Sequence, residues 1–195
     1  MSLRVEALKG NKIAPVIADV AALRIAVFRD WPYLYEGDLA YERNYLRAYQ
    51  ESPGAVIVVA LDGEALVGAS TGLPLPEADA EFAEAFAGSE YDPAEIFYCA
   101  ESVLLPAYRG QGAGHQFFDL REAHARKLGF RYSAFCGVIR PKDHPARPAQ
   151  YRPLDAFWQK RGYTPLDGVV AHFAWRDLGD EAESPKPLQF WIHSL

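Results

Sequence analysis

Residues 104–114 read Leu-Leu-Pro-Ala-Tyr-Arg-Gly-Gln-Gly-Ala-Gly, and no other segment constrains the architecture of the chain as strongly. An apolar strand runs into a proline, then into a loop with three glycines, and then into a helix. Such a loop presents backbone N–H groups, and the start of the helix adds the positive end of its dipole. The segment therefore predicts an anion site, for which phosphate is the usual ligand. A tight strand-to-helix turn without a ligand is the alternative.

Two common phosphate loops do not match this segment. A Walker loop needs Gly-x-x-x-x-Gly-Lys-Ser/Thr, and no Lys followed by Ser or Thr stands here. A dinucleotide fingerprint needs Gly-x-Gly-x-x-Gly, and the third glycine is replaced by His115 or Phe117 in the two registers. The pattern that remains is Arg-x-x-Gly-x-Gly, formed by Arg109, Gly112 and Gly114.

This loop resembles the pyrophosphate loop of the GCN5-related N-acetyltransferases, the GNAT family, which bind acetyl-coenzyme A. In that family an apolar strand ending in proline precedes the loop. A helix, a strand and a short helix with an aromatic-x-x-x-Gly-aromatic ending follow it. The corresponding segments here are residues 102–106, 112–128, 132–139 and 157–163. The resemblance covers about residues 95–165 closely and the rest of the chain by the order of its elements.

The resemblance implies that acetyl-coenzyme A is the co-substrate and that its pantetheine arm fills a gap between two splayed strands. Val103 and Leu105 are the positions expected to supply main-chain hydrogen bonds to that arm. A Cβ atom at Gly112 or Gly114 would stand between the amides and the phosphate oxygens, which explains the glycines. The other positions expected to contact the coenzyme are Leu104, Arg109, Gly110, Gln111, Ala113 and Trp158.

By the same resemblance an amine attacks the thioester directly, and a base near the strand before the loop removes its proton. Glu101 and Tyr98 are the candidates, and strand alternation places them on opposite faces unless a bulge intervenes. We favour Glu101, because a carboxylate in an apolar strand is costly unless it is used or paired. The alternative is an ion pair of Glu101 with Arg121 or another buried base.

Position 158 departs from the family pattern. Many relatives carry a tyrosine there, four residues before the helix-ending glycine, whose hydroxyl protonates the coenzyme sulfur. The residue here is Trp158, and an indole N–H is not an acid at neutral pH. The leaving thiolate is therefore expected to take its proton from water, Tyr151 or Tyr163, and Trp158 to pack against the pantetheine arm or the adjacent strand.

The amine is expected to enter over the two N-terminal helices and the loop between them. Trp31, Tyr33, Tyr35 and Glu36 lie in that loop, and aromatic faces beside carboxylates suit an organic cation. Alternatively, the rings cap the core and the acids face solvent. We expect no metal site, because the isolated histidines show no paired ligand spacing.

The bulk properties limit the partners. The chain has 195 residues, half of them hydrophobic, and a formal net charge of −6. This length suits one domain, and the acidic balance argues against a nucleic-acid partner. No apolar run approaches the roughly 20 residues of a membrane span. The two cysteines lie in apolar runs, which indicates buried free thiols and a cytoplasmic protein.

We expect an α/β (α+β) fold, a single domain over residues 1–195 whose mixed, mostly antiparallel sheet has about seven strands and about four flanking helices. The strands are expected at 3–8, 55–61, 65–73, 96–105, 132–139, 169–175 and 188–194, with residues 169–195 forming the C-terminal strands. The helices are expected at 16–29, 39–50, 77–88, 112–128 and 153–161, of which the third belongs to an insertion at about 77–90.

These features indicate an acetyl-coenzyme A-dependent N-acetyltransferase that acts on a small amine. A non-catalytic acyl-coenzyme A sensor on the same fold is the alternative, favoured by Trp158. A nucleotide-binding regulatory domain is a third hypothesis, which the missing Walker lysine opposes. Residues 188–195 are apolar on both faces of a terminal strand, so we expect a homodimer formed through it. Burial of this strand within one subunit, between the sheet and the helix at 77–88, is the alternative.

Overall fold

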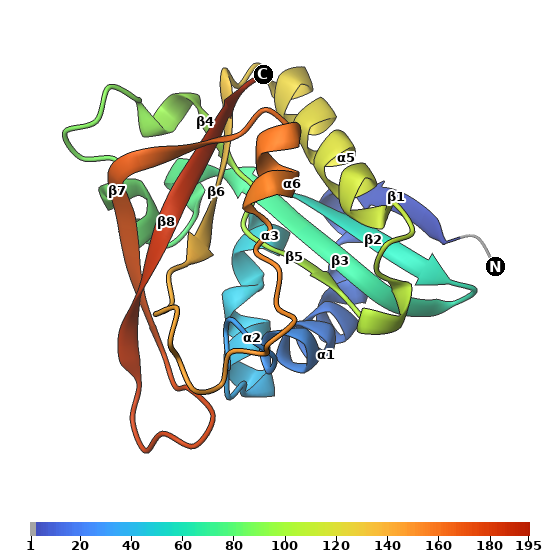
Figure 1. The fold of residues 1–195 in the computed structure, drawn as a ribbon. Helices are drawn as coiled ribbons and strands as arrows, with labels where there is room; N and C mark the ends of the chain where they lie inside the picture. The colour runs from blue at the N-terminus through green and yellow to red at the C-terminus, as the bar shows by residue number, and fades with distance from the viewer. Residues whose placement is uncertain (1–2) are drawn as a thin grey trace.

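All the strands join one sheet in this computed structural model, which describes residues 3–195 (Figure 1). The order along the sheet is β1-β2-β3-β4-β6-β8-β7, and β5 pairs with β3. Among the strands of residues 3–195, β4 and β6 are the one parallel pair. The expected mixed, mostly antiparallel sheet is confirmed, with eight strands among the described residues. The strands are β1 (Arg4–Leu8), β2 (Val56–Asp62), β3 (Ala65–Pro74), β4 (Ile96–Tyr98), β5 (Ser102–Leu104), β6 (Tyr132–Val138), β7 (Thr164–Trp175) and β8 (Ser184–Ser194).

Helices cover both faces of the sheet, because its central strands are apolar on both sides. In β2, Ile57 packs into the cluster that holds the first helix, whereas Val58 packs into the cluster that holds Phe117 of α5. Strand alternation therefore feeds two separate cores. In Figure 1, α1, α2 and α3 lie on one side and α5 on the other. The helices are α1 (Ile17–Phe28), α2 (Leu39–Tyr45), α3 (Arg47–Glu51), α4 (Ala80–Glu84), α5 (Ala113–Leu128) and α6 (Asp155–Lys160).

Several element boundaries differ from the sequence expectation. The helix expected over 39–50 is interrupted at Leu46 and becomes α2 and α3. The helix expected over 77–88 is only α4, although Phe82 and Phe86 of this segment are buried as a packed insertion requires. β7 and β8 both begin earlier than expected, because Thr164 at the start of β7 pairs with Ile192 and Ser184 at the start of β8 pairs with Trp175. Long-range pairing decided these ends, and local propensity did not.

The largest difference concerns the strand expected over 96–105. It is two strands, and residues 99–101 between them leave the regular ladder. The N–H of Cys99 still donates to Ala134 of β6 (2.8 Å), but the next N–H, of Ala100, donates to Thr71 of β3 (3.1 Å). After this break β5 pairs only with β3, whereas β6 continues along β8. The expected splay between the two central strands is therefore built at residues 99–101.

Arg121 of α5 holds this break from the other face of the sheet. Its side chain is buried, and its Nη1 donates to the carbonyl oxygens of Thr71 (3.1 Å) and Glu101 (3.0 Å). Its Nη2 donates to the hydroxyl of Ser102 (2.9 Å). One planar guanidinium thus links β3, residue 101 and the start of β5. A point-like ammonium does not offer this spread of donors.

The C-terminal strand is covered on all sides within the chain. β8 pairs with β6 along one edge and with β7 along the other. Phe190 contacts Phe86 (ring centroids 4.7 Å apart), and Trp191 contacts Trp158 on the opposite face (5.1 Å). The apolar pattern that led us to expect a homodimer is therefore explained within one subunit, as the alternative had it. The oligomeric state stays a prediction, which light scattering tests. Among residues 3–195, no helix combines the length and apolar character that crossing a membrane requires.

Replacing Arg121 by lysine should lower the free energy of unfolding by about 3 kcal/mol, because buried carbonyls lose donors while a buried charge remains. Urea denaturation measures the change. Arg126→Lys on the same helix is the matched control, since its side chain is 48% exposed, and it should shift stability by less than about 0.5 kcal/mol. Equal stability of the two variants would show that Arg121 does not hold the break.

Candidate active site

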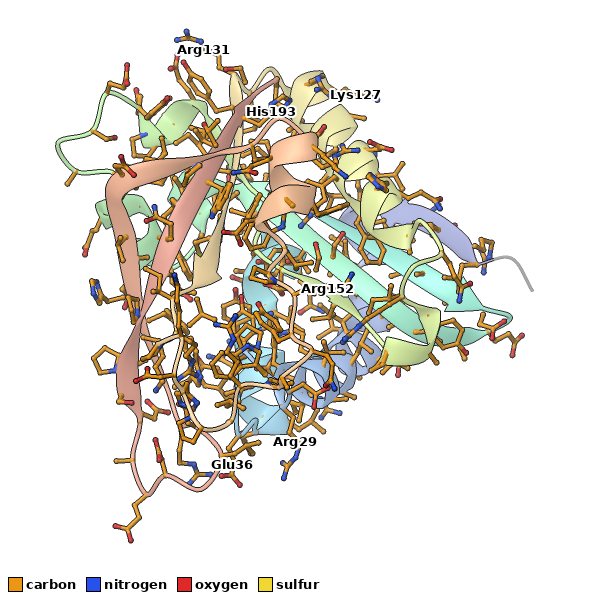
Figure 2. All side chains as sticks on the ribbon, viewed as in Figure 1. Arg29, Glu36, Lys127, Arg131, Arg152 and His193 are labelled. Atoms are coloured by element: carbon orange, nitrogen blue, oxygen red, sulfur yellow. The ribbon has the colours of Figure 1, made fainter. Side chains whose placement is uncertain are left out.

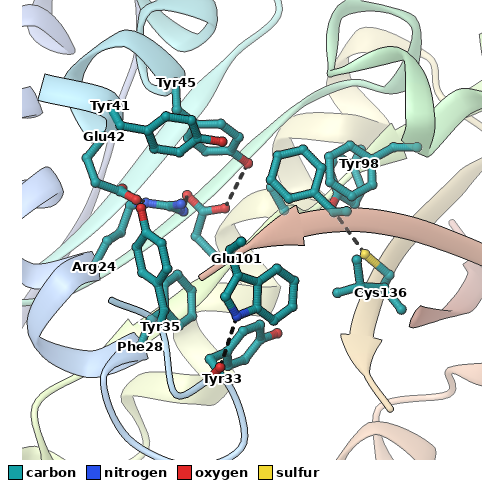
Figure 3. Close-up of a pocket in the computed structure, with 15 residues that line it drawn as sticks. Arg24, Phe28, Tyr33, Tyr35, Tyr41, Glu42, Tyr45, Tyr98, Glu101 and Cys136 are labelled. Carbon is teal, nitrogen blue, oxygen red and sulfur yellow. Dashed lines mark hydrogen bonds and ion pairs between the residues drawn. The ribbon is translucent and has the colours of Figure 1, made fainter. Parts of the chain in front are cut away.

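A cavity opens between the N-terminal helices and the C-terminal strands, beside the break in the central strand (Figure 3). Its empty volume is about 640 Å³, with the open solvent at its mouth included. α1 and α2 form one wall, β6, β7 and β8 form the other, and residues 100–101 lie between them. Aromatic rings dominate the lining, and five of them are tyrosines: Tyr33, Tyr35, Tyr41, Tyr45 and Tyr98.

Both candidate bases, Glu101 and Tyr98, line this one cavity. A regular strand would direct residues three apart to opposite faces. The irregular residues 99–101 cancel that alternation, so the bulge left open by the sequence is present. The strand break therefore delivers a carboxylate and a phenol to the same space.

The carboxylate of Glu101 belongs to a buried cluster with Arg24 of α1 and Glu42 of α2. The Arg24 guanidinium pairs with Glu42 through Nε and with Glu101 through Nη1. The hydroxyl of Tyr45 donates to Glu101 Oε2 (3.5 Å), and the Arg24 guanidinium carbon lies 4.5 Å from the Tyr45 ring centroid. Burial alone would lower the pKa of Arg24, but the charges of Glu101 and Glu42 raise it. One positive and two negative side chains leave the cavity wall with a net charge of −1.

Sequence reasoning missed Arg24 and Glu42 as parts of this site. Asp38 caps α2, because its Oδ1 accepts from the N–H of Tyr41 (2.8 Å). Glu42 lies in the first turn of this helix, and its side chain is fully buried against Arg24. An arginine on the apolar face of the helix at 16–29 was the available signal, since a buried cation needs a partner.

Burial keeps the other polar groups of the cavity neutral. It raises the pKa of the Tyr98 hydroxyl well above its usual range, and the neighbouring Cys136 raises it further. The Tyr98 hydroxyl lies 3.3 Å from the Cys136 sulfur, and burial raises the pKa of that thiol to about 12. A phenol that resists ionisation is a poor proton acceptor. Of the two candidates, the Glu101 carboxylate is thus better suited to accept a proton than the neutral Tyr98 phenol.

The four expected substrate residues fall into two groups. Tyr33 and Tyr35 line the cavity, whereas Trp31 and Glu36 do not. The Trp31 ring packs against His144, with centroids 5.0 Å apart. The Glu36 side chain is 40% exposed at the periphery of the molecule, 3.8 Å from Arg176 (Figure 2). The alternative of a solvated acid therefore describes Glu36, and the rings that pack against the core are those of Tyr33 and Tyr35.

Arg140, which follows β6, fixes the segment that carries Tyr33 and Tyr35. Its guanidinium donates to the carbonyl oxygens of Pro32 (2.8 Å) and Tyr33 (2.6 Å) and to both carboxylate oxygens of Asp177 (2.7 and 2.9 Å). Burial alone would raise the pKa of Asp177, but the hydrogen bonds and charges of Arg140 and Lys186 outweigh it and lower the pKa. The aromatic wall of the cavity is thus tied to the β7–β8 hairpin.

The glycine loop at the start of α5 fits an anion. Among residues 3–195, no hydrogen-bond acceptor is recorded for the backbone N–H groups of residues 110–114. Gly110 and Gly112 have φ angles of +76° and +85°, which favour glycine, and a Cβ atom on either would point into open space. Gly114 differs, because its Cβ would face Phe157 at an ordinary contact distance of 3.7 Å. A row of free amides with space above it is the cradle that a pyrophosphate needs.

The main-chain groups available along β5 are not those that we expected. The N–H of Leu105 donates to Val67 of β3 (3.0 Å), and Val103 is paired with Ala69. Since antiparallel strands bond through alternate residues, Val103 and Leu105 are directed toward β3. The groups that face the splay belong to Ser102 and Leu104, one residue away from the expected positions, and of these the Leu104 carbonyl accepts from Arg109 Nε (3.2 Å).

Tyr151 and Tyr163, the two side chains considered for protonating the thiolate, and Trp158 have separate environments. The Tyr163 hydroxyl is buried and bonded to Ser133 (2.8 Å) and Glu122 (3.0 Å) on the α5 side of the sheet, so it does not reach the cavity. Trp158 is half-buried and packs over Gly137 of β6, as packing against an adjacent strand requires. Tyr151 is half-buried, with its ring 5.9 Å from Trp31.

Comparison with known proteins gives one consistent result. A family model described as "Acetyltransferase (GNAT) family" matches residues 21–163. No curated protein matches the sequence. Solved structures match over nearly the whole chain, at identities where the likeness concerns the fold alone.

Three of these structures illustrate the match. YncA from Salmonella typhimurium, solved with its cofactor acetyl-CoA, has 12% identity, a TM-score of 0.58 and coverage of 100% of this chain and 95% of that one. Ribosomal-protein-alanine N-acetyltransferase from Brucella melitensis has 12% identity, a TM-score of 0.61 and coverage of 98% and 99%. A polyamine N-acetyltransferase from Drosophila melanogaster has 12% identity, a TM-score of 0.62 and coverage of 100% of both chains.

Replacing Arg140 by alanine should cost roughly 3 kcal/mol of stability, because Asp177 keeps only Lys186 at 3.6 Å as a partner and the Pro32 carbonyl loses its donor in a mostly buried place. Thermal and urea unfolding measure the loss, and exposed Arg43→Ala on α2 is the control.

The pH dependence of stability provides a second readout for Asp177. Since its pKa is lowered in the folded state, its contribution is present above the unfolded pKa of about 4 and is lost as the pH falls through the folded pKa. Wild type should lose more stability in that acid window than Arg140→Ala. If the stability of wild type and of Arg140→Ala fell equally with pH, Arg140 would not be what stabilises the ionised Asp177 carboxylate.

Proposed function

The chain belongs to the GNAT acetyltransferase family, whose co-substrate is acetyl-coenzyme A, and we propose that it acetylates the amino group of a small molecule bound beside Glu101. The observation that carries this proposal is the break at residues 99–101. It opens the strand gap on one side and brings a buried carboxylate into a cavity on the other. Release of free coenzyme A thiol with a panel of amines tests the proposal.

Acetyl-coenzyme A supplies the activated thioester carbonyl when it is bound. The free amides of residues 110–114 and the exposed guanidinium of Arg109 are the groups that would hold its pyrophosphate. The outward main-chain groups of Ser102 and Leu104 would hold the pantetheine arm. Gln111 contributes by bracing the loop, because its side-chain amide donates to the Ala107 carbonyl (3.3 Å).

Glu101 accepts the proton of the substrate ammonium, which frees the nitrogen lone pair for attack. Arg24 and the Tyr45 hydroxyl hold the carboxylate in place. Tyr33 and Tyr35, which also line the cavity, enclose the substrate from the side of the loop between α1 and α2. Water or Tyr151 returns a proton to the leaving thiolate, since Tyr163 is committed to Glu122.

A non-catalytic acyl-coenzyme A sensor is the second candidate, and Trp158 at the family's tyrosine position is the observation that favours it. Coenzyme binding without thiol release for any amine would support the sensor. We place the protein in the cytoplasm, because Cys99 and Cys136 are buried free thiols of the kind that a reducing compartment maintains.

Arg109→Ala should raise the KM for acetyl-coenzyme A about tenfold, since one charge-assisted hydrogen bond to phosphate is lost. Steady-state kinetics with varied coenzyme measures this. Lys127→Ala makes the same change of net charge at the far end of α5 (Figure 2) and should alter the KM by less than about twofold. An equal effect of both variants would reduce the role of Arg109 to general charge.

Glu101→Gln should lower kcat about 100-fold and leave the KM for acetyl-coenzyme A unchanged, because general bases contribute about 10²–10⁴-fold. The variant should fold, since Arg24 keeps its pair with Glu42. A weakly basic amine such as an arylhydrazine, which is already neutral in the assay, should lose much less rate. A loss of equal size for strongly and weakly basic amines would assign Glu101 a structural role.

A further inference from the structure

The two walls of the cavity differ in charge, and we infer from this that the acceptor is an amine with a single positive charge and an apolar body, such as an arylalkylamine. This inference rests on the proposed function and specifies its substrate. Di- and polyamines and amino acids are the competing classes. The two walls accommodate different parts of such an amine.

The wall formed by α1, α2 and the strand break attracts one cation. Its charged side chains are Arg24, Glu42 and Glu101, with a net charge of −1. Arg24 pairs with Glu42 through Nε and with Glu101 through Nη1, so its positive charge is already outweighed and this wall repels a substrate carboxylate. In a buried site this uncompensated negative charge acts over short distances with little screening. One ammonium neutralises the wall, and a second would exceed its charge.

The opposite wall is apolar and offers no charge to a second ammonium. Phe82 stacks on Phe173 with ring centroids 5.4 Å apart, and Trp175 and Leu188 continue this surface. The indole N–H of Trp175 donates to the Tyr33 carbonyl (3.0 Å), so the ring presents only its carbon framework. A phenyl or branched alkyl group is the natural occupant, because burying apolar surface is favourable there.

Charged side chains behind the apolar wall increase the difference in charge between the two walls. Arg140 and Lys186 both lie against the Trp175 ring, at 5.8 and 5.2 Å from its centroid. Asp177 is the carboxylate that pairs with both, so this group carries a net charge of +1. A second ammonium would be repelled by it. A substrate carboxylate would find no free donor either, since the Lys186 ammonium is bound to the Trp175 and Ser184 carbonyls (3.0 and 2.9 Å).

The first experiment compares 2-phenylethylamine, 1,4-diaminobutane and phenylalanine as acceptors of the wild-type enzyme. The kcat/KM from thiol release should be about 10- to 100-fold higher for phenylethylamine than for either competitor. A diamine or an amino acid used as well as phenylethylamine would overturn the inference. If no amine releases thiol, the proposed function fails, and calorimetric binding of the same three compounds then decides what the cavity accepts.

The second experiment moves a charge onto the apolar wall. Phe173 is only partly buried, so it tolerates a polar side chain. Phe173→Glu should shift the ratio of kcat/KM values about tenfold toward 1,4-diaminobutane, relative to Phe173→Gln, which has the same shape without the charge. The ratio is internal to each variant, so a partial loss of stability does not affect it. Identical ratios in the two variants would show that this wall does not face the distal part of the substrate, and the inference would fall.

Discussion

The buried guanidinium of Arg121 and the carbonyls of Thr71 and Glu101 form the interaction on which the site depends. At the break each of these carbonyls keeps one main-chain donor, the N–H of Ala100 for Thr71 and the N–H of Thr71 for Glu101, and Arg121 supplies the second. Arg121 reaches them from α5 and makes the break at residues 99–101 a stable feature. Without the break, β5 would continue beside β6 and Glu101 would point away from the cavity. The gap for the coenzyme and the site for the amine thus share one structural cause.

The buried charges show where the fold tolerates polar groups for function. Arg24, Glu42 and Glu101 form an ion cluster that is costly to desolvate, and a hydrophobic replacement would serve stability as well. Arg140, Asp177 and Lys186 form a second cluster on the other side of the cavity. The two clusters carry opposite net charges and are separated by aromatic rings. The field across the cavity is therefore a property of the fold, and it orients a molecule with one charged end and one apolar end.

The sequence predicted the elements whose signals are local. The strands expected at 55–61 and 65–73 and the helix expected at 112–128 are all present. The glycine loop and its flanking elements also indicated the family. The errors have a common form. The strand over 96–105 looked continuous because Cys99 and Ala100 are as apolar as their neighbours, and the main-chain groups of Val103 and Leu105 face β3 because register depends on pairing. Tyr163 was a candidate acid until its position on the α5 side became clear.

Local sequence patterns were sufficient to predict the architecture of this chain, since hydrophobic periodicity, turn-forming residues and a phosphate-loop motif are each found within consecutive residues. The composition of the cavity was not accessible in that way. Arg24, Glu42 and Glu101 are far apart in the sequence, and a charged residue in an apolar stretch has no partner until the chain folds. Packing of α1, α2 and the strand break brings them within contact, and the low dielectric of that place gives their net charge its weight. The sequence therefore indicated what kind of reaction the chain supports, and the tertiary contacts decided which side chains surround the substrate.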